Sequence, residues 1–169
     1  MRIESITKED FGIAVSNHPD DAFALRYFIP HATKDELWGT TYGAYKNGLL
    51  AGAIALRERP NYFNIKLLHT FAAHRKQGVA RALCDWAVAK AYCAGKKYFR
   101  VAANPNAFAF YRAVGFKIRG IQRSGCGLVA FRIGGPEIKH AIYEEDEQIR
   151  QWVHAKQMGG CVKVFPEPC

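Results

Sequence analysis

The chain has 169 residues, of which 49% are hydrophobic and 13% aromatic; this predicts one folded domain and excludes an intrinsically disordered chain. No apolar run approaches the roughly 20 residues that a membrane-spanning helix needs, and residues 1–5 lack the charged-then-apolar layout of a signal peptide. We therefore expect a cytoplasmic protein with no membrane partner. Five cysteines without a Cys-x-x-Cys pair and six scattered histidines predict neither a disulfide framework nor a bound metal.

The positive charge is concentrated in the middle of the chain. The net charge is +9, but residues 61–135 carry 13 Lys and Arg against a single acid, Asp85, a local net charge of +12. A segment this basic predicts an anionic ligand or partner. Polyphosphate cofactors and nucleic acids both meet that description.

The first half of the chain predicts a strand, two helices, a β-hairpin and a further strand. In chain order these elements are expected at residues 2–6, 8–16, 20–29, 40–44, 48–57 and 65–72. The hairpin rests on Lys46-Asn47-Gly48, because Asn-Gly readily adopts the positive φ angles of a type I′ turn. Pro30 ends the second helix.

The second half predicts helices alternating with strands. The strongest helical pattern covers residues 78–94 and ends at Gly95, with apolar residues on one face at Ala82, Leu83, Trp86, Ala87 and Ala91. A strand at 98–103 leads into a short helix that Asn104 would cap, with Pro105 in its first position. Closing strands are expected at 116–121 and 128–133. A last helix with an acidic first turn at 144–147 is expected to dock on the domain.

The start of the long helix is unusually basic. Cations flank it at His74, Arg75, Lys76 and Arg81, whereas the first acid in the helix is Asp85. A helix N-terminus carries about half a positive charge and free N–H groups, so cations there repel one another unless an anion lies among them. Gly78 and Ala80 leave room for the backbone to approach a ligand. The pattern predicts a pyrophosphate held by backbone amides; a surface turn with exposed cations is the alternative for the loop alone.

A second motif lies one helix and one strand further on. It consists of Asn104, Ala107, Tyr111 and Gly115-Phe116. Together with Arg75-x-x-Gly78-x-Ala80, it resembles the GCN5-related N-acetyltransferase (GNAT) superfamily. The resemblance is strong over residues 62–121 and extends in strand order over about 1–135.

The resemblance implies an α/β fold with a mixed, mostly antiparallel central sheet flanked by helices. Residues 1–135 would form the acyltransferase domain. The resemblance does not cover residues 136–169, which are expected from their own pattern to form a C-terminal extension with one docked helix. Acetyl-CoA would be the acyl donor, without a metal. The cofactor would contact strand residues Leu68, His69 and Thr70, the loop residues Arg75, Lys76, Gln77, Gly78, Val79, Ala80 and Arg81, and also Asn104 and Tyr111.

The resemblance also implies the chemistry of the site. Tyr111 would point at the thioester sulfur and protonate the departing thiolate, which needs little help because a phenol has a pKa near 10 and a thiol one near 8 to 9. A backbone N–H near a strand bulge would stabilise the developing oxyanion. The acceptor amine would attack directly. Asn104 could instead be only a helix cap, and Tyr111 only a core aromatic.

One part of the family pattern is missing. Many members use a Glu as general base, but the strands at 64–70 and 98–103 contain no acid, and Phe99 occupies one such position. His69, whose ordinary pKa suits a base at neutral pH, Glu58 at the end of its strand, and a water chain are the alternatives. His69 could equally be a packed strand residue.

The acceptor is specified least. The leading interpretation is an N-acetyltransferase acting on an amine-bearing small molecule or protein. A protein of the same fold that modifies a nucleic acid is an alternative, but no aromatic residues interleave with the basic ones as base stacking would require. A non-catalytic acyl-CoA-binding module is the third, and a homodimer stays open.

Overall fold

The structure is a computed structural model that describes residues 1–25, 40–103, 105–121 and 127–132. Its strands form one sheet in the order β1-β2-β3-β4-β5-β7-β6. They are β1 (Arg2–Ser5), β2 (Thr40–Lys46), β3 (Leu49–Glu58), β4 (Tyr62–Thr70), β5 (Tyr98–Ala103), β6 (Lys117–Ile121) and β7 (Gly127–Arg132). The helices are α1 (Lys8–Ser16), α2 (Pro19–Ala24), α5 (Val79–Cys93) and α6 (Phe108–Ala113), with 3₁₀ turns η1 (Ala72–His74) and η2 (Pro105–Ala107).

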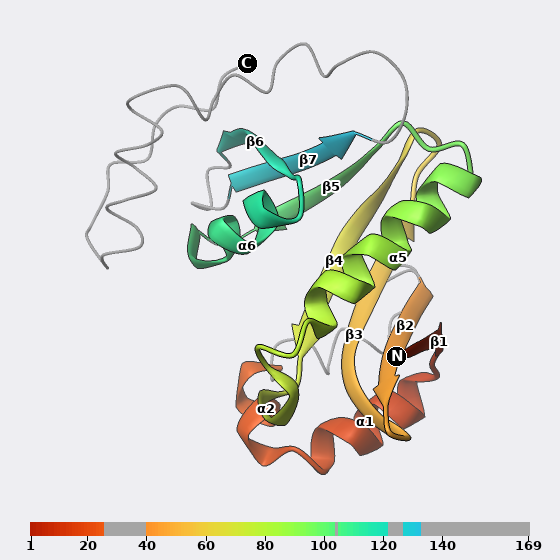
Figure 1. The fold of residues 1–169 in the computed structure, drawn as a ribbon, viewed down its shortest axis with the longest axis vertical. Coiled ribbons are helices and arrows are strands. Elements are labelled where there is room, and N and C mark those ends of the chain that lie inside the picture. The colour runs from red at the N-terminus through yellow and green to blue at the C-terminus, as the bar shows by residue number, and fades with distance from the viewer. Residues whose placement is uncertain (26–39, 104, 122–126, 133–169) are drawn as a thin grey trace.

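The sheet is antiparallel except where β4 runs parallel to β5. Two apolar cores lie on its faces. Figure 1 shows α5 across the near face of β3 and β4, where the larger core includes Val79, Leu83, Ile54, Phe99 and Phe108. The smaller core joins α1 and α2 to the sheet through Phe11, Val15, Leu25, Leu67 and Phe71. The predicted mixed, mostly antiparallel sheet flanked by helices is confirmed.

Strands β4 and β5 pair over only part of their length. Tyr62–Ile65 pair with Tyr98–Val101, and beyond that point the two strands diverge (Figure 1). Within the described residues, the second half of β4, 66–70, therefore has β3 as its hydrogen-bonded neighbour but not β5. Its backbone groups on the β5 side are left for another partner.

A β-bulge lies where the strands diverge. Ala55 pairs with Leu67 and Leu56 pairs with Ile65, so Lys66 is the extra residue in β4. The bulge changes the face to which the side chains point: Ile65 belongs to the core beneath α5, whereas Leu67 belongs to the core beneath α1 and α2.

Most predicted elements form close to their expected bounds. Asn47 and Gly48 have φ angles of 52° and 79°, as the predicted hairpin turn requires. The second helix is described as α2 up to Ala24. The short helix differs from the prediction, because a 3₁₀ turn occupies Pro105–Ala107 and the α-helix begins only at Phe108. Asn104 and the predicted C-terminal helix lie outside the described residues. No helix of the described part is long and apolar enough to cross a membrane.

Candidate functional site

The loop between β4 and α5 turns through two residues with left-handed backbone. Lys76 has φ 59° and Gly78 has φ 78°, and α5 begins directly afterwards at Val79. Left-handed residues in a tight turn bring successive backbone N–H groups to one concave side, an arrangement that binds anions. Among non-glycine residues the left-handed conformation costs energy, so the strain at Lys76 marks a loop whose shape is held by its surroundings.

The N-terminus of α5 has no side-chain cap. Its N-cap is Gly78, and its first turn contains no acid. The first intrahelical hydrogen bond runs from the Ala82 N–H to the Gly78 carbonyl at 2.9 Å. The amides of Val79, Ala80 and Arg81 precede that bond, so they have no carbonyl acceptor within the helix. With the positive end of the helix dipole, they favour an anion at this point.

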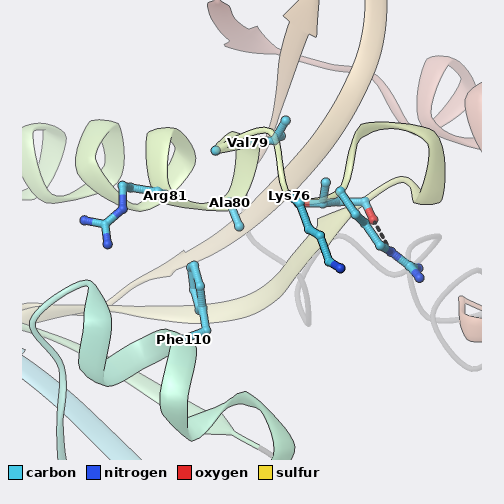
Figure 2. A pocket seen from close by; sticks show the side chains of 8 residues that line it. Lys76, Val79, Ala80, Arg81 and Phe110 are labelled. Atoms are coloured by element: carbon cyan, nitrogen blue, oxygen red, sulfur yellow. Dashed lines mark hydrogen bonds between the residues drawn. The ribbon is translucent and has the colours of Figure 1, made fainter.

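A cavity of about 330 Å³ opens at this helix end. It is lined by Thr70, Arg75, Lys76, Gly78, Val79, Ala80, Arg81 and Phe110. Figure 2 shows Lys76 and Arg81 on opposite sides of Ala80, with the Phe110 ring of α6 facing this helix end. Seven of these residues are among those predicted to contact a cofactor, and Phe110 adds an apolar wall. The loop predicted to hold a pyrophosphate therefore borders an open space that three cationic side chains help to line, those of Arg75, Lys76 and Arg81.

Thr70 carries an unused polar atom at the cavity. Its hydroxyl oxygen is buried and has no hydrogen-bond partner within the described part of the chain. Such an atom costs free energy unless a ligand or water satisfies it. Glycine at position 52 brings the surrounding backbones together, since an added Cβ there would lie 2.7 Å from the His69 carbonyl and 2.8 Å from Val79 Cγ1.

Asp21 lies behind the loop and is almost completely buried, at 1% exposure. One carboxylate oxygen accepts hydrogen bonds from His69 Nε2 at 2.9 Å and from Arg75 Nη2 at 3.3 Å, and the other accepts from the Ala72 N–H at 3.0 Å. No acid lies close to the loop in the sequence, but the fold brings the Asp21 carboxylate into contact with Arg75. The basicity of the loop is thus partly balanced by the protein itself.

Two other loop side chains are also engaged. Arg81 donates from Nη2 to the Ala113 carbonyl at 3.0 Å, which ties α5 to the C-terminal end of α6. Gln77 donates to the Ala73 carbonyl at 3.0 Å and accepts from Lys46 Nζ at 2.6 Å. Lys46 therefore adds a cation beside the loop from the β2–β3 hairpin.

His69 faces α2 through its contact with Asp21. Burial lowers the pKa of its imidazole below 6.5, although the hydrogen bond and charge of Asp21 act in the opposite direction. The ring is thus held neutral near neutral pH, and one of its nitrogens is taken by Asp21. A histidine oriented by a buried carboxylate is an arrangement found in general bases and equally in structural networks.

Tyr111 lies on α6, one residue after Phe110, and is 6% exposed. Its ring contacts Phe110 and Phe116 edge-on, with centroids 5.3 and 5.2 Å away. Burial raises the pKa of the phenol well above its ordinary 10, with a smaller contribution from Cys84. Burial likewise raises the pKa of the Cys84 thiol to about 12. Both groups therefore keep their protons at neutral pH.

Glu58 lies apart from the loop. It forms an ion pair with Lys96 at 2.6 Å and pairs in the sheet with Phe63, on the far side of the Lys66 bulge from Thr70. It lines a separate cavity of about 470 Å³ with Lys90 and Cys93 of α5. Leu68 lies in the half of β4 that pairs with β3 but not with β5, and Asn104 lies outside the described residues.

Sequence reasoning missed three residues near the site: Asp21, Lys46 and Phe110. Asp21 and Lys46 are brought to the loop by tertiary packing, and no local pattern marks them. Phe110 is different, because it lies beside Tyr111 in the second motif and one position of that helix must face the loop. Among the residues described here, no group of three or more His, Cys, Asp or Glu side chains is placed to hold a metal.

Solved structures share this fold at low sequence identity. An IAA acetyltransferase from Bacillus cereus ATCC 14579 is 21% identical with a TM-score of 0.55, over 78% of this chain and 98% of that one. A PaiA N-acetyltransferase from Thermoplasma acidophilum, in complex with coenzyme A, is 15% identical with a TM-score of 0.61, over 78% and 99%. Tetrahymena GCN5 is 14% identical with a TM-score of 0.65, over 81% and 99%.

The chain matches a protein family by sequence, although it matches no individual curated protein. No curated protein matches the chain significantly. Residues 8–132, however, match the family described as the acetyltransferase (GNAT) domain. These residues include β4, α5, α6 and the segment between β4 and α5, residues 71–78, whose proposed role gives it the name phosphate loop below. The match covers well over half of the chain and agrees with the fold, so this protein belongs to the GNAT acetyltransferase family.

Proposed function

We propose that this protein transfers an acetyl group from acetyl-CoA to an amine by direct attack. The observation that carries the proposal is the uncapped N-terminus of α5, which opens into a cavity lined by Arg75, Lys76 and Arg81. An anionic cofactor fits this donor set. It would meet three free amides, three cations and the unused Thr70 hydroxyl.

Different parts of the chain would bind different parts of the cofactor. The amides from Lys76 to Arg81 would bind the pyrophosphate. The diverging half of β4 offers Leu68 and Thr70 backbone groups to the pantetheine arm, in the manner of an added strand. Asn104 is proposed for the same arm on the strength of the family motif. Acetyl-CoA itself supplies the activated acyl group and the thiolate leaving group.

Tyr111 is proposed as the general acid. Its raised pKa keeps the proton on Oη throughout the neutral range, and the proton can then pass to a departing sulfur. The same burial makes the transfer less favourable than for an ordinary phenol, because a thiolate of pKa near 8 to 9 is a weaker base than the Tyr111 phenolate. The proposal therefore requires the pKa of Tyr111 to fall when the cofactor binds. The contacts with Phe110 and Phe116 hold the ring, and with it the position of Oη.

The proton acceptor for the amine is proposed to be His69 or bulk water. His69 is neutral near pH 7 and is oriented by Asp21. Glu58 is a weaker choice, because its carboxylate is paired with Lys96 at a distance from the loop along β3. An acceptor amine of low pKa would attack without help from either group.

The decisive experiment combines binding with turnover. Calorimetry with acetyl-CoA tests the cavity, and a thiol-release assay over a panel of amines tests catalysis. We expect binding of acetyl-CoA and turnover of at least one amine. A protein that binds no CoA ester would overturn the proposal, and binding without turnover across a broad panel would support a non-catalytic module.

Tyr111→Phe tests the acid. Phenylalanine keeps the ring contacts with Phe110 and Phe116 and removes only Oη. General acid catalysis is typically worth about 10²- to 10⁴-fold, so we expect kcat to fall by about 10²-fold or more while acetyl-CoA binding is retained. Equal kcat for the variant and the wild-type protein would reject the acid assignment but leave cofactor binding standing.

A nucleic-acid substrate is the competing function within the same fold. Three of the cations in residues 61–135 line the cavity, so bound CoA would account for part of the local charge. Titration of single-stranded and double-stranded RNA and DNA at several salt concentrations separates the two. Tight binding with a steep salt dependence, and with transfer to the nucleic acid, would favour the competing function.

A further inference from the structure

The buried carboxylate of Asp21 connects helix α2 to the phosphate loop. Its two oxygens accept three hydrogen bonds, from His69 Nε2, from Arg75 Nη2 and from the Ala72 backbone N–H, at 2.9, 3.3 and 3.0 Å. The donors lie at the end of β4, at the start of η1 and in the loop. Each donor is within nine residues of the left-handed turn at Gly78, so one side chain contacts the chain at three points on its way into that turn.

Burial makes this contact energetically important. Asp21 is the buried charged residue of the described core, at 1% exposure, and a desolvated carboxylate is tolerated only where donors surround it. A stacked pair beside it, His18 on Phe71 with centroids 4.5 Å apart, fixes α2 against the same segment. The loop is therefore supported from the side of the sheet that carries α2, whereas its amides face the cavity beside α5.

Arg75 transmits this support to the cavity. Its Nε donates to the Thr70 carbonyl at 3.4 Å and its Nη2 to Asp21 at 3.3 Å. The side chain is nevertheless 56% exposed and lines the cavity. A long flexible cation held at two points loses less freedom when an anion binds beside it, and such preorganisation increases affinity.

We infer that Asp21 is a positioning residue for acyl-CoA binding: from α2 it holds Arg75 and the backbone of the phosphate loop in the shape that receives the pyrophosphate. The inference rests on the proposed function. It also joins α2 to the cofactor loop as one unit, since the carboxylate bridges 51 residues of sequence to Ala72.

Whether Asp21→Asn weakens or strengthens CoA binding distinguishes a positioning role from a purely electrostatic one. Asp21→Asn removes a negative charge close to an anion site, and Coulomb attraction alone would then make CoA bind more tightly. Positioning predicts the opposite, because an amide cannot accept from Arg75 and Ala72 as a carboxylate does. Asp20→Asn is the matched control, since the neighbouring residue in α2 carries the same charge but is exposed.

The experiment measures CoA affinity by calorimetry, steady-state kinetics, and the melting temperature of the free protein. For Asp21→Asn we expect the Kd for CoA and the KM for acetyl-CoA to rise about tenfold. Because Asp21 also orients His69, the proposed proton acceptor, kcat is expected to fall as well, and the Kd for CoA is the measurement that decides the inference. Asp20→Asn should leave all of these unchanged. An unchanged or lower Kd for a folded Asp21→Asn protein overturns the inference.

Arg75 supplies a second variant that does not depend on a buried site. Arg75→Gln at a half-exposed position is expected to fold and to raise the Kd for CoA by a similar factor. In a double-mutant cycle, adding Asp21→Asn to Arg75→Gln should raise the Kd for CoA by at most about a further threefold, because the two residues act through one contact. Wild-type affinity in Arg75→Gln, or full additivity of the two effects, rejects the inference. A wild-type protein that binds no CoA would reject the proposed function as well, whereas normal wild-type binding with unaffected variants rejects the positioning role alone.

Discussion

Replacement of Gly78 by alanine tests the phosphate cradle most directly. Gly78 is the N-cap of α5 and has φ 78°. An added Cβ would meet no atom within 4 Å, so the substitution creates no clash inside the protein. Gly78 lines the cavity, so under the proposed function the new methyl group would stand in the path by which the pyrophosphate approaches the amides.

The protein contains a matched control at the other end of the same helix. Gly95 follows α5, has φ 67°, and also offers open space to a Cβ. Alanine in a left-handed conformation costs about 1–2 kcal/mol, so both variants should lose similar stability. For a chain of this size, about 1 kcal/mol corresponds to roughly 2–4 °C in Tm. Both melting temperatures should therefore fall by about 2–8 °C.

Only Gly78→Ala should impair the cofactor. We expect its Kd for CoA to rise at least about tenfold, which is about 1.4 kcal/mol, whereas Gly95→Ala should bind as the wild-type protein does. Differential scanning fluorimetry without ligand and calorimetry with CoA separate the two effects. The reasoning fails if the two variants bind CoA equally well, because the cavity at α5 would then not receive the cofactor.

Three further predictions concern the strands beneath the loop. Thr70→Val removes the buried, unpartnered hydroxyl and should raise the stability of the free protein by about 1 kcal/mol, while CoA affinity falls; a loss of stability in a melting experiment would contradict this. Gly52→Ala places a Cβ 2.7 Å from a backbone oxygen and should lower the free energy of unfolding by about 1–3 kcal/mol. Its control is Gly12→Ala in α1, where the Cβ meets open space and should raise the free energy of unfolding by about 0.5–1 kcal/mol. Urea denaturation measures both. The pKa of His69 is lowered in the folded protein, mainly by burial and against the effect of Asp21, so the unfolded chain binds more protons below its ordinary value of 6.5, and stability should fall as the pH drops below about 6.5. His69→Gln should flatten that part of a Tm-against-pH profile, and an unchanged slope would refute the assignment.

Local sequence signals predicted the elements that local physics determines. Asn47-Gly48 specifies its turn because both residues tolerate positive φ. Helix α5 begins after Gly78 and ends before Gly95, which are the residues that the pattern marked. The seven predicted residues that line the cavity all lie between the end of β4 and the first turn of α5, so the order of the sequence is enough to bring them together.

The features that the sequence did not reveal depend on pairing between distant segments. Ile65-Lys66-Leu67 reads as ordinary strand, and the bulge at Lys66 exists only because β3 pairs with both sides of it. The divergence of β4 from β5 is likewise a relation between two strands. In the short helix, Asn104-Pro105 signals a start, but the chain first forms a 3₁₀ turn and the α-helix begins at Phe108.

The basic loop shows why a count of charges along the sequence describes the site incompletely. Arg75 is 54 residues from Asp21 in sequence, yet the two are 3.3 Å apart. Arg75 therefore does not by itself demand an anion, and Arg81 spends part of its donor capacity on the Ala113 carbonyl. The proposed anion site rests instead on the uncapped amides of α5 and on Lys76, because this helix end has neither an acid in its first turn nor a side-chain cap. Neutralising Arg75 should consequently weaken CoA binding through loss of positioning, whereas obstructing the amides at Gly78 should abolish the principal contact.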